Sequence, residues 1–385
     1  MLGPFSVDMY LPAFPAIGGE LGASSIALQQ TLSAYLFAFA FMMLWHGALS
    51  DALGRRPIVL GALAVFAVAT LGCAIAGNIE SLWLFRALQG LSSGAGVVVG
   101  RAIIRDRFDG ADAQRLMSRM TMVFAIAPAI APVMGGLLLE AFGWRSLFWV
   151  LLGLCVAVFA WSAAALPETL PREARQTLHP RALWRSYRSV ISRTDFLLLA
   201  LIPSMNFCAF FIYIASAPAF LIDLLGVSSL GFAWLFIPMI IGIMLGAATS
   251  GRLAGRTASK RTVELGYAMM FTGAAVNVAI CWLVNPGVPW NVLPVMIFTF
   301  GSSLATPSLT LLMLDLFPAT RGLASSLQGF VQFALSGAVA GTVAPFLAHS
   351  VGALALGMTG FTLAGFALWF VYQRRARISL QGWHP

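Results

Sequence analysis

Long apolar runs separated by short polar gaps dominate the pattern of the chain. A run of about 20 apolar residues is long enough to cross a hydrocarbon core of about 30 Å as a helix. Eleven such runs follow one another, and a shorter run, residues 1–18, precedes them. The predicted spans after it are 29–50, 57–76, 81–104, 119–140, 147–166, 196–222, 229–250, 263–284, 291–314, 322–348 and 352–372. The pattern therefore predicts an all-α polytopic membrane protein with twelve crossings.

Positive charge alternates between the gaps. Of the 23 lysine and arginine residues, all but Arg86 and Arg145 lie in, or at the edge of, every second gap. Cytoplasmic loops of membrane proteins carry an excess of these residues. We therefore expect both termini on the cytoplasmic side.

Composition supports this class and excludes others. The chain is 59% hydrophobic and 10% charged, whereas soluble domains are about 25% charged. The net charge of +9 is scattered over loops without a basic face and interleaved aromatics, so nucleic acid is not an expected partner. The four cysteines lie inside apolar runs without CxxC spacing or a nearby histidine, which indicates packing residues and predicts neither a metal site nor a cofactor.

The first run is too short for a regular crossing. Residues 1–17 would rise only about 26 Å as a helix, and Pro12 and Pro15 disfavour regular helix near the far end. A charged leader with a small-residue cleavage site is absent, so a removed signal peptide does not explain the run. Our hypothesis is that the first helix is truncated and that the natural protein begins upstream of Met1.

The longest interior polar loop divides the chain into two halves. We predict an N-terminal six-helix bundle over 1–166, a cytoplasmic linker over 167–194, and a C-terminal six-helix bundle with a short cytoplasmic tail over 195–385. Apolar positions in the linker predict an interfacial amphipathic stretch on anionic headgroups. The segment Gly47–Arg56 has a weak echo in Gly251–Lys260, which indicates repeats related by a pseudo-two-fold axis.

Three segments resemble motifs of the major facilitator superfamily. Gly47–Arg56 resembles its G-x-L-a-D-r-x-G-r-r loop, and Phe85–Gly90 resembles its fourth-span R-x-x-q-G motif. Ala127–Gly136 resembles the fifth-span motif of the drug/proton antiporter branch, although Ala131 stands where the usual pattern has glycine. The resemblance implies two six-helix bundles that transport a solute by alternating access.

A further pair of segments is specific to a subfamily. Asp8–Pro12, followed by Thr31–Tyr35, resembles the Bcr/CflA-type multidrug-resistance exporters. The resemblance covers essentially the whole chain, and its motifs carry no information about the substrate.

Ionisable residues inside the membrane are costly and mark pathways. Asp8 and Arg86 lie well inside predicted spans, and His46 lies nearer an end. Burial penalises the charged form of a carboxyl and a nearby guanidinium stabilises it, so the proton affinity of such a pair depends on conformation. Our hypothesis is that Asp8 binds the coupling proton and that Arg86 tunes it. The alternative is a static buried ion pair that orders the spans.

The loop motif predicts a cytoplasmic latch, a set of contacts that holds the cytoplasmic face closed in one state. Asp51 could accept hydrogen bonds from a helix N-terminus in the opposite half, and Arg55 or Arg56 could pair with Asp106. The alternative is charge that merely sets topology. The residues assigned to the latch are Gly47, Asp51, Gly54, Arg55, Arg56 and Asp106.

The fifth predicted span contains two prolines and a pair of glycines. Pro128 and Pro132 each remove a backbone donor, while Gly135 and Gly136 allow close helix packing. We predict a helix hinge here, with a purely packing role as the alternative.

The resemblance implies that spans 1, 4, 7 and 10 line the cavity, and Tyr35 lies nearby on the second span. The nominated substrate residues are Tyr10, Tyr35, Asn206, Phe207, Phe210, Phe211 and Tyr213. This set is mostly apolar and aromatic, which suits loosely recognised amphipathic molecules. Each residue taken singly also fits a lipid-facing or packing role.

The leading interpretation is proton-coupled export of small amphipathic drugs, such as phenicol-like or bicyclomycin-like antibiotics, by a monomer in the cytoplasmic (inner) membrane of a bacterium. The alternative is the same fold carrying a small metabolite in either direction. An enzyme is not expected, because the four histidines are scattered and HExxH and GxSxG motifs are absent.

Overall fold

The computed structural model describes residues 2–108, 110–175, 179–317 and 320–381. Parts of the predicted linker (176–178) and of the predicted tail (382–385) lie outside the described residues. Every regular element in the described residues is helical, as expected.

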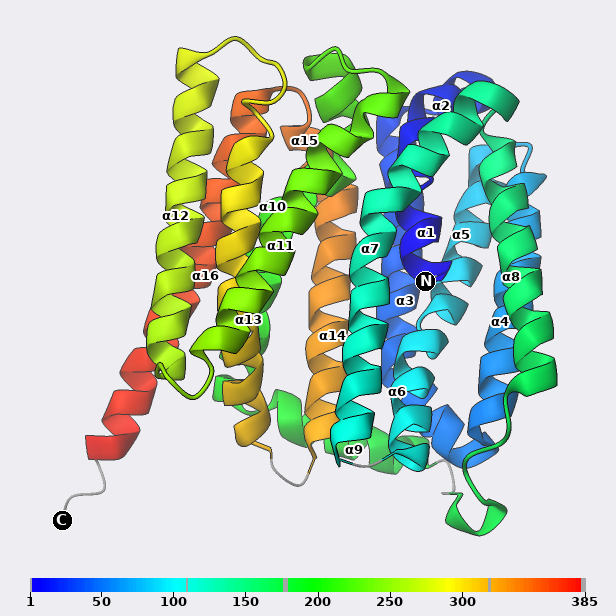
Figure 1. Ribbon diagram of the computed structural model, residues 1–385, viewed down its shortest axis with the longest axis vertical. Coiled ribbons are helices and arrows are strands. Elements are labelled where there is room, and N and C mark those ends of the chain that lie inside the picture. Colours follow the sequence, from blue (N-terminus) through cyan, green and yellow to red (C-terminus); the bar gives the residue numbers. More distant parts are fainter. Residues whose placement is uncertain (1, 109, 176–178, 318–319, 382–385) are drawn as a thin grey trace. The chain divides into compact units, whose positions relative to one another are not determined.

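The helices follow the predicted spans closely, with short 3₁₀ and π segments, labelled η, at several helix ends (Figure 1). In chain order they are α1 (Leu2–Asp8), η1 (Leu11–Ala13), α2 (Phe14–Leu21), α3 (Ser25–Leu53), α4 (Arg55–Ala74), α5 (Ile79–Ser93), α6 (Ala95–Arg107), α7 (Gly110–Phe142), α8 (Arg145–Ala165), η2 (Arg172–Ala174), α9 (Pro180–Ile191), α10 (Thr194–Ala215), η3 (Ala219–Leu224), η4 (Ser229–Phe232), α11 (Ala233–Leu253), α12 (Ser259–Leu283), α13 (Leu293–Asp315), α14 (Arg321–Ala338), η5 (Val339–Val343), α15 (Ala344–Leu347) and α16 (Val351–Gln381).

Ten helices of the described chain are long and apolar enough to cross a membrane. They coincide with ten of the predicted spans, and α5 and α6 together form one of them. The predicted fifth crossing falls on α7, whose apolar portion is Ile126–Phe142. The first crossing is broken into α1, η1 and α2, and Pro12 and Pro15 lie at the two breaks. The chain is therefore a multi-pass membrane protein.

Two compact units divide the chain. The first unit comprises Met1–His179, Val227–Phe236 and Ala340–Pro345. The second unit comprises Pro180–Gly226, Ile237–Val339 and Phe346–Pro385. The predicted linker is thus shared, because its first part belongs to one unit and α9 to the other.

In the first unit, α3 packs along α5, α4 packs along α5 and α8, and α1 lies against α7 (Figure 1). Two glycines make these approaches possible. A Cβ atom at Gly90 would overlap the carbonyl oxygen of Tyr35, and one at Gly135 would overlap the carbonyl oxygen of Met9. Close approach of this kind is typical of helix packing in membranes.

Arg145 is an exception to the charge pattern, and the structure explains it. Its guanidinium forms an ion pair with Glu20, which also accepts a hydrogen bond of 2.6 Å from Trp144 Nε1. The hydrogen bond from Arg145, with that from Trp144, holds the pKa of Glu20 below its ordinary value. The positive charge of Arg145 is therefore neutralised locally by Glu20, near the end of α2.

In the second unit, α12 packs along α13, and α10 packs along α16, α13 and α14 (Figure 1). Helix α9 is the predicted amphipathic stretch, and it contacts α10 and α14. Tyr187 and Val190 are buried there, whereas Trp184 is exposed. Tyr187 and Val190 thus cover neighbouring helices, and contact of this stretch with lipid headgroups stays a prediction.

Candidate functional site

Arg86 is the central group of the site. It lies on α5 with no exposed surface, and its Nη1 donates to the Ser6 carbonyl oxygen and to Gln89 Oε1, both at 2.8 Å. The guanidinium carbon lies 4.6 Å from the ring centroid of Tyr10 and 4.7 Å from that of Tyr35. Cation–π contacts of this kind stabilise a desolvated cation. The guanidinium thus lies against two aromatic rings, and no acidic partner of it is found among the described residues.

A second layer of hydrogen bonds fixes these neighbours. Gln89 Nε2 donates to Thr70 Oγ1 at 2.8 Å, which links α5 to α4. The Tyr10 and Thr31 hydroxyls share a hydrogen bond of 2.9 Å, which links the broken first crossing to α3. Arg86 is therefore held rigidly by four segments of the first unit.

Asp8 lies close to this cluster but does not join it. Its side chain is 6% exposed, and no hydrogen bond or ion pair of Asp8 is found among the described residues. The Nε and Nη2 atoms of Arg86 likewise have no partner there. Two residues correspond to about 200° of helical rotation, so Asp8 leaves α1 on the face opposite to that of Ser6. The expected ion pair between Asp8 and Arg86 is not formed in this structure.

Asp8 is nevertheless only two residues from Ser6, whose carbonyl oxygen accepts a hydrogen bond from Arg86. The Tyr35 ring lies against the Arg86 guanidinium, and the Tyr35 hydroxyl donates to Ser93 Oγ at 2.8 Å. A buried charge is costly unless it is paired and hydrogen-bonded. The Asp8 carboxyl and the Nε and Nη2 atoms of Arg86 have no partners among the described residues. The charged form of Asp8 is therefore not stabilised by a partner in this arrangement.

His46 is the third ionisable group that the sequence singled out. It is buried on α3 against Gly94, and its Nδ1 atom has no partner among the described residues. On α3 it lies about three turns beyond Tyr35, toward the loop before Arg55 and Arg56.

The predicted contact of Arg55 with Asp106 is formed, and its role as a cytoplasmic latch stays a prediction. Arg55 Nε lies 3.0 Å from Asp106 Oδ2, as expected, and the same guanidinium pairs with Asp51. Arg56, the alternative partner, instead donates from its Nη2 to the Ala163 carbonyl oxygen at 2.7 Å. The next position on a helix points about 100° further round, here toward α8. The predicted contact of Asp51 with the opposite half stays a prediction.

Glu168 is a residue of this region that sequence reasoning did not assign. Its Oε1 atom accepts the backbone N–H groups of Arg55 at 2.9 Å and of Thr169 and Leu170 at 3.0 Å. An acid at a helix N-terminus satisfies free donors and favours the helix dipole. Gly54 has φ +105°, and a Cβ there would overlap Glu168 Oε2. The glycine of the loop motif thus makes room for the acid that caps α4.

Burial and hydrogen bonding oppose each other at Glu168. Partial burial raises its pKa. Hydrogen bonds from the backbone N–H groups at the start of α4 and directly after Glu168 lower it by more, so the pKa lies below its ordinary value of 4.5. Oε2 also lies 3.6 Å from Arg175 Nη2. A signal existed in the sequence, since Glu168 is an acid in an arginine-rich loop directly after a predicted span.

The fifth-span motif is built into α7. The helix continues through Pro128 and Pro132, and Gly135 admits the backbone of Met9, as predicted for close packing. Gly136 is buried beside it. Motion at this hinge stays a prediction.

On α10 the structure brings three predicted substrate residues together. The Phe207 ring lies 4.9 Å from that of Phe210 and 5.5 Å from that of Phe211, measured between centroids. Phe333 of α14 and Phe298 of α13 adjoin this cluster. The second unit therefore holds an aromatic group contributed by three helices.

The two polar candidates on α10 are engaged with α12 instead. Tyr213 accepts a hydrogen bond of 2.6 Å from Asn277 Nδ2, and Asn206 Oδ1 accepts one of 3.2 Å from the Tyr267 hydroxyl. Asn206 Nδ2 has no partner among the described residues. Tyr10 and Tyr35, the candidates of the first unit, contact Arg86.

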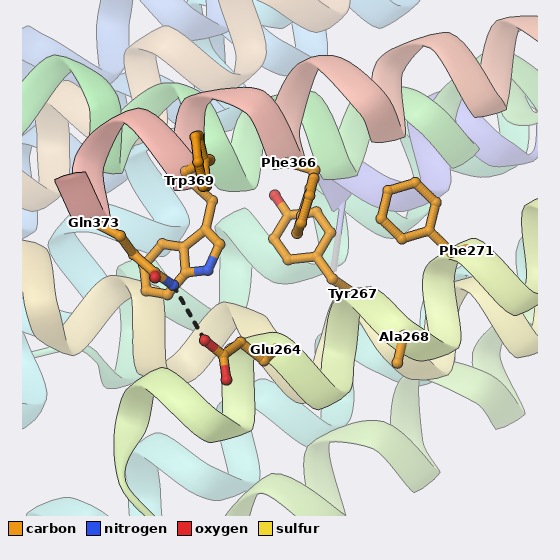
Figure 2. A pocket seen from close by; sticks show the side chains of 8 residues that line it. Glu264, Tyr267, Ala268, Phe271, Phe366, Trp369 and Gln373 are labelled. Carbon is orange, nitrogen blue, oxygen red and sulfur yellow. Dashed lines mark hydrogen bonds between the residues drawn. The ribbon is translucent and has the colours of Figure 1, made fainter.

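Two pockets lie outside the Arg86 cluster, and one of them is lined by Arg56 and Glu168 of the charged loop region. One, of about 420 Å³, lies between α12 and α16, and the other, of about 450 Å³, lies beside the loop after α8. The first is lined by Glu264, Tyr267, Ala268, Phe271, Phe366, Trp369, Phe370 and Gln373 (Figure 2). Sequence reasoning singled out none of these eight residues.

A multi-pass helical chain with a buried arginine and a charged loop cluster is typical of membrane transporters. The family profile of the Major Facilitator Superfamily matches residues 1–341, and the chain belongs to this superfamily. Multidrug resistance protein D of Escherichia coli (strain K12) is 30% identical over 99% of this chain and 95% of its own length. The Bicyclomycin resistance protein homolog of Haemophilus influenzae is 28% identical over 89% of this chain and 86% of its own length.

Solved structures support the fold. A bacterial homolog of the human lysosomal transporter Spinster, in an inward-facing and unoccupied conformation, is similar with a TM-score of 0.73. It is 15% identical, and the match covers 97% of this chain and 94% of that one. The family and this structural neighbour are transporters rather than enzymes.

Proposed function

We propose that this protein exports small amphipathic drugs across the membrane in exchange for protons. The drug-resistance names of relatives at about 30% identity support the substrate class. The observation that carries the coupling is the buried Asp8, which has no partner among the described residues and lies two residues after Ser6, whose carbonyl oxygen accepts from Arg86 Nη1. The superfamily works by alternating access between two bundles.

The chemistry of coupling follows from the free donors of Arg86. In the described arrangement Asp8 has no partner, which favours the neutral, proton-bearing acid. A shift of the broken first crossing would bring the carboxyl to Arg86 Nε and Nη2, which would stabilise the anion and release the proton. No covalent step is needed, because the proton is bound and released by one carboxyl.

The substrate site in this proposal is aromatic. Phe207, Phe210 and Phe211 offer flat apolar surface, and Asn206 offers an amide donor without a partner. Such a surface accepts varied amphipathic molecules because few fixed polar groups must be matched. Tyr10, Tyr35 and Tyr213 contribute from positions that are hydrogen-bonded in this structure.

We further propose the arrangement that this function needs. The bundles are residues 1–166 and 195–385, and both termini lie on the cytoplasmic side of the inner membrane of a bacterium. The protein acts as a monomer on protons and a small molecule. Asp51, Arg55 and Asp106 close the cytoplasmic face in one state, while Pro128 and Pro132 let α7 flex.

Drug susceptibility tests this function directly. An efflux-deficient bacterial host expressing the chain should tolerate higher concentrations of some amphipathic antibiotics, and a proton uncoupler should abolish the difference. Asp8→Asn should behave like the empty vector, whereas the exposed Asp223→Asn should behave like the unmodified chain. Equal susceptibility with and without the chain across a broad drug panel, at verified membrane expression, would reject drug export.

A further inference from the structure

The pocket between α12 and α16 has a polar end and an aromatic body. At the polar end, Gln373 Nε2 lies 3.4 Å from Glu264 Oε1 (Figure 2). Lys260 Nζ lies 3.7 Å from the same oxygen. The body is formed by aromatic rings, those of Tyr267 and Phe271 on α12 and of Phe366, Trp369 and Phe370 on α16. Its volume of about 420 Å³ falls within the usual range of ligand pockets, roughly 300–1,000 Å³.

Trp369 supplies a hydrogen-bond donor that the protein does not use. The side chain is 2% exposed, and its Nε1 atom has no partner among the described residues. Indole nitrogen only donates, and a buried donor without an acceptor costs about 1–3 kcal/mol. Figure 2 shows the indole on the side of α16 that faces α12. The pocket therefore lacks an acceptor close to Trp369.

The pocket opens toward lipid rather than water. Phe366 and Phe370 line it and are 38% and 47% exposed, and Leu363 nearby on α16 is 54% exposed. Helices α12 and α16 both have the length and apolar character of membrane crossings. Exposed apolar side chains on such helices face acyl chains, so a molecule that enters here comes from the bilayer.

The charges around the mouth are complementary to a zwitterion. Glu264 is a half-exposed carboxylate beside aromatic faces, a combination that binds ammonium groups. Lys260 and Arg374 add positive charge, and the Arg374 guanidinium lies 4.3 Å from the ring centroid of Phe370. One anionic and one cationic subsite are thus available within the same mouth.

We propose that this pocket binds the headgroup of a membrane phospholipid that carries a primary ammonium group, as phosphatidylethanolamine does. The ammonium donates to Glu264 and takes the place of Lys260 in the present ion pair. The phosphate accepts from Trp369 Nε1 and is neutralised by Lys260 or Arg374. The acyl chains run along the exposed faces of Phe366 and Phe370.

Native mass spectrometry of the purified full chain tests this proposal. The chain is incubated with phosphatidylethanolamine, phosphatidylglycerol or phosphatidylcholine of equal acyl length, and bound lipid is counted. Phosphatidylethanolamine should be retained best, because phosphatidylglycerol lacks the cation and phosphatidylcholine lacks N–H donors. Loss of one charge-assisted hydrogen bond should weaken apparent affinity about tenfold or more.

Two variants and two controls locate the site. Glu264→Gln and Trp369→Phe should each lower retention of phosphatidylethanolamine, and Glu264→Gln should bring it near the level of phosphatidylglycerol. The exposed Glu80→Gln and Trp282→Phe should leave it unchanged. Equal unfolding temperatures of the variants without lipid show that the fold is intact.

Three results would overturn the proposal. Equal retention of all three lipids would remove headgroup recognition, and unchanged retention in both Glu264→Gln and Trp369→Phe would place the lipid elsewhere. Displacement of the lipid by soluble phosphoethanolamine at comparable concentration would show that the natural occupant is a free zwitterion rather than a lipid.

Discussion

Arg86 is positioned by interactions that suit a guanidinium and no other cation. Its planar group is flanked by Tyr10 and Tyr35, while one nitrogen donates to both Ser6 and Gln89. A lysine ammonium is a compact point charge and cannot make both ring contacts and both hydrogen bonds together. The charge alone does not explain why this residue is arginine.

Arg86→Lys is therefore expected to destabilise the protein and to lower transport. Each lost contact contributes about 1 kcal/mol, so the unfolding temperature of the purified variant should fall by several degrees. The exposed Arg252→Lys should leave it unchanged. Fluorescence-detected thermal unfolding measures both, and equal stability of Arg86→Lys and the unmodified chain would contradict the described geometry.

Sequence reasoning identified the ionisable residues but not their contacts. Asp8 and Arg86 stood out because charge inside an apolar run is rare. Whether Asp8 contacts Arg86 depends on where α1 ends and on the direction in which the Asp8 side chain points. The break in the helix before Pro12 determines both. Aromatic enclosure by Tyr10 and Tyr35 joins three distant segments, so no local pattern could reveal it.

At the scale of single elements, the packing of α7 depends on Gly135. A methyl group there would overlap the Met9 carbonyl oxygen, which is backbone and cannot rotate away. Overpacking of this kind costs about 1–3 kcal/mol. Gly135→Ala should lower the unfolding temperature and disturb the broken first crossing that carries Asp8.

Gly153→Ala on α8 is the matched control for that change. Nothing lies within 4 Å of a Cβ at Gly153, and alanine is the better helix former by up to about 1 kcal/mol. Equal or raised stability is expected for it. A Gly135→Ala variant as stable as Gly153→Ala would show that α7 can move away from Met9.

The cap on α4 predicts a pH dependence. Because hydrogen bonds keep the folded pKa of Glu168 below 4.5, its stabilising effect is complete above that ordinary value and is lost as pH falls through the lower folded pKa. Glu168→Gln should thus be less stable than the unmodified chain at pH 7, by about 1 kcal/mol as for other caps.

The difference between the two proteins should shrink as pH falls below 4.5, since the unmodified carboxylate then takes up a proton. Thermal unfolding at a series of pH values follows this difference. A difference that stays constant from pH 7 to pH 4 would mean that the carboxylate charge at Glu168 plays no part in holding α4.

The positions of the helices were easier to predict from the sequence than the contacts between them. Apolar run length located the crossings, and proline located the breaks in the first one. The cap by Glu168 was missed because the residue is separated from α4 by more than 100 positions, and only folding brings them together. The pocket at Trp369 was missed because aromatic residues in apolar runs are indistinguishable from ordinary packing.

At the scale of the whole molecule, the charge pattern predicts which loops face the cytoplasm. The loop at Ala258 lies in an arginine-rich gap and that at Asn285 in a gap without arginine, and both residues are exposed. On a Cys281→Ala background, Ala258→Cys should react with a membrane-impermeant maleimide only after the cells are opened.

Asn285→Cys should react in intact cells under the same conditions. The remaining native cysteines are buried and should contribute little background. Labelling of both positions from the same side would contradict the proposed orientation and the count of twelve crossings.

The central claim is that Asp8 carries the coupling proton, and transport in proteoliposomes tests it most directly. With a pH gradient imposed, the unmodified chain and Asp223→Asn should accumulate a labelled drug, and Asp8→Asn should not. Without a gradient, all three should exchange labelled for unlabelled drug, because exchange needs no net proton movement. Accumulation by Asp8→Asn at the rate of the unmodified chain would contradict the account.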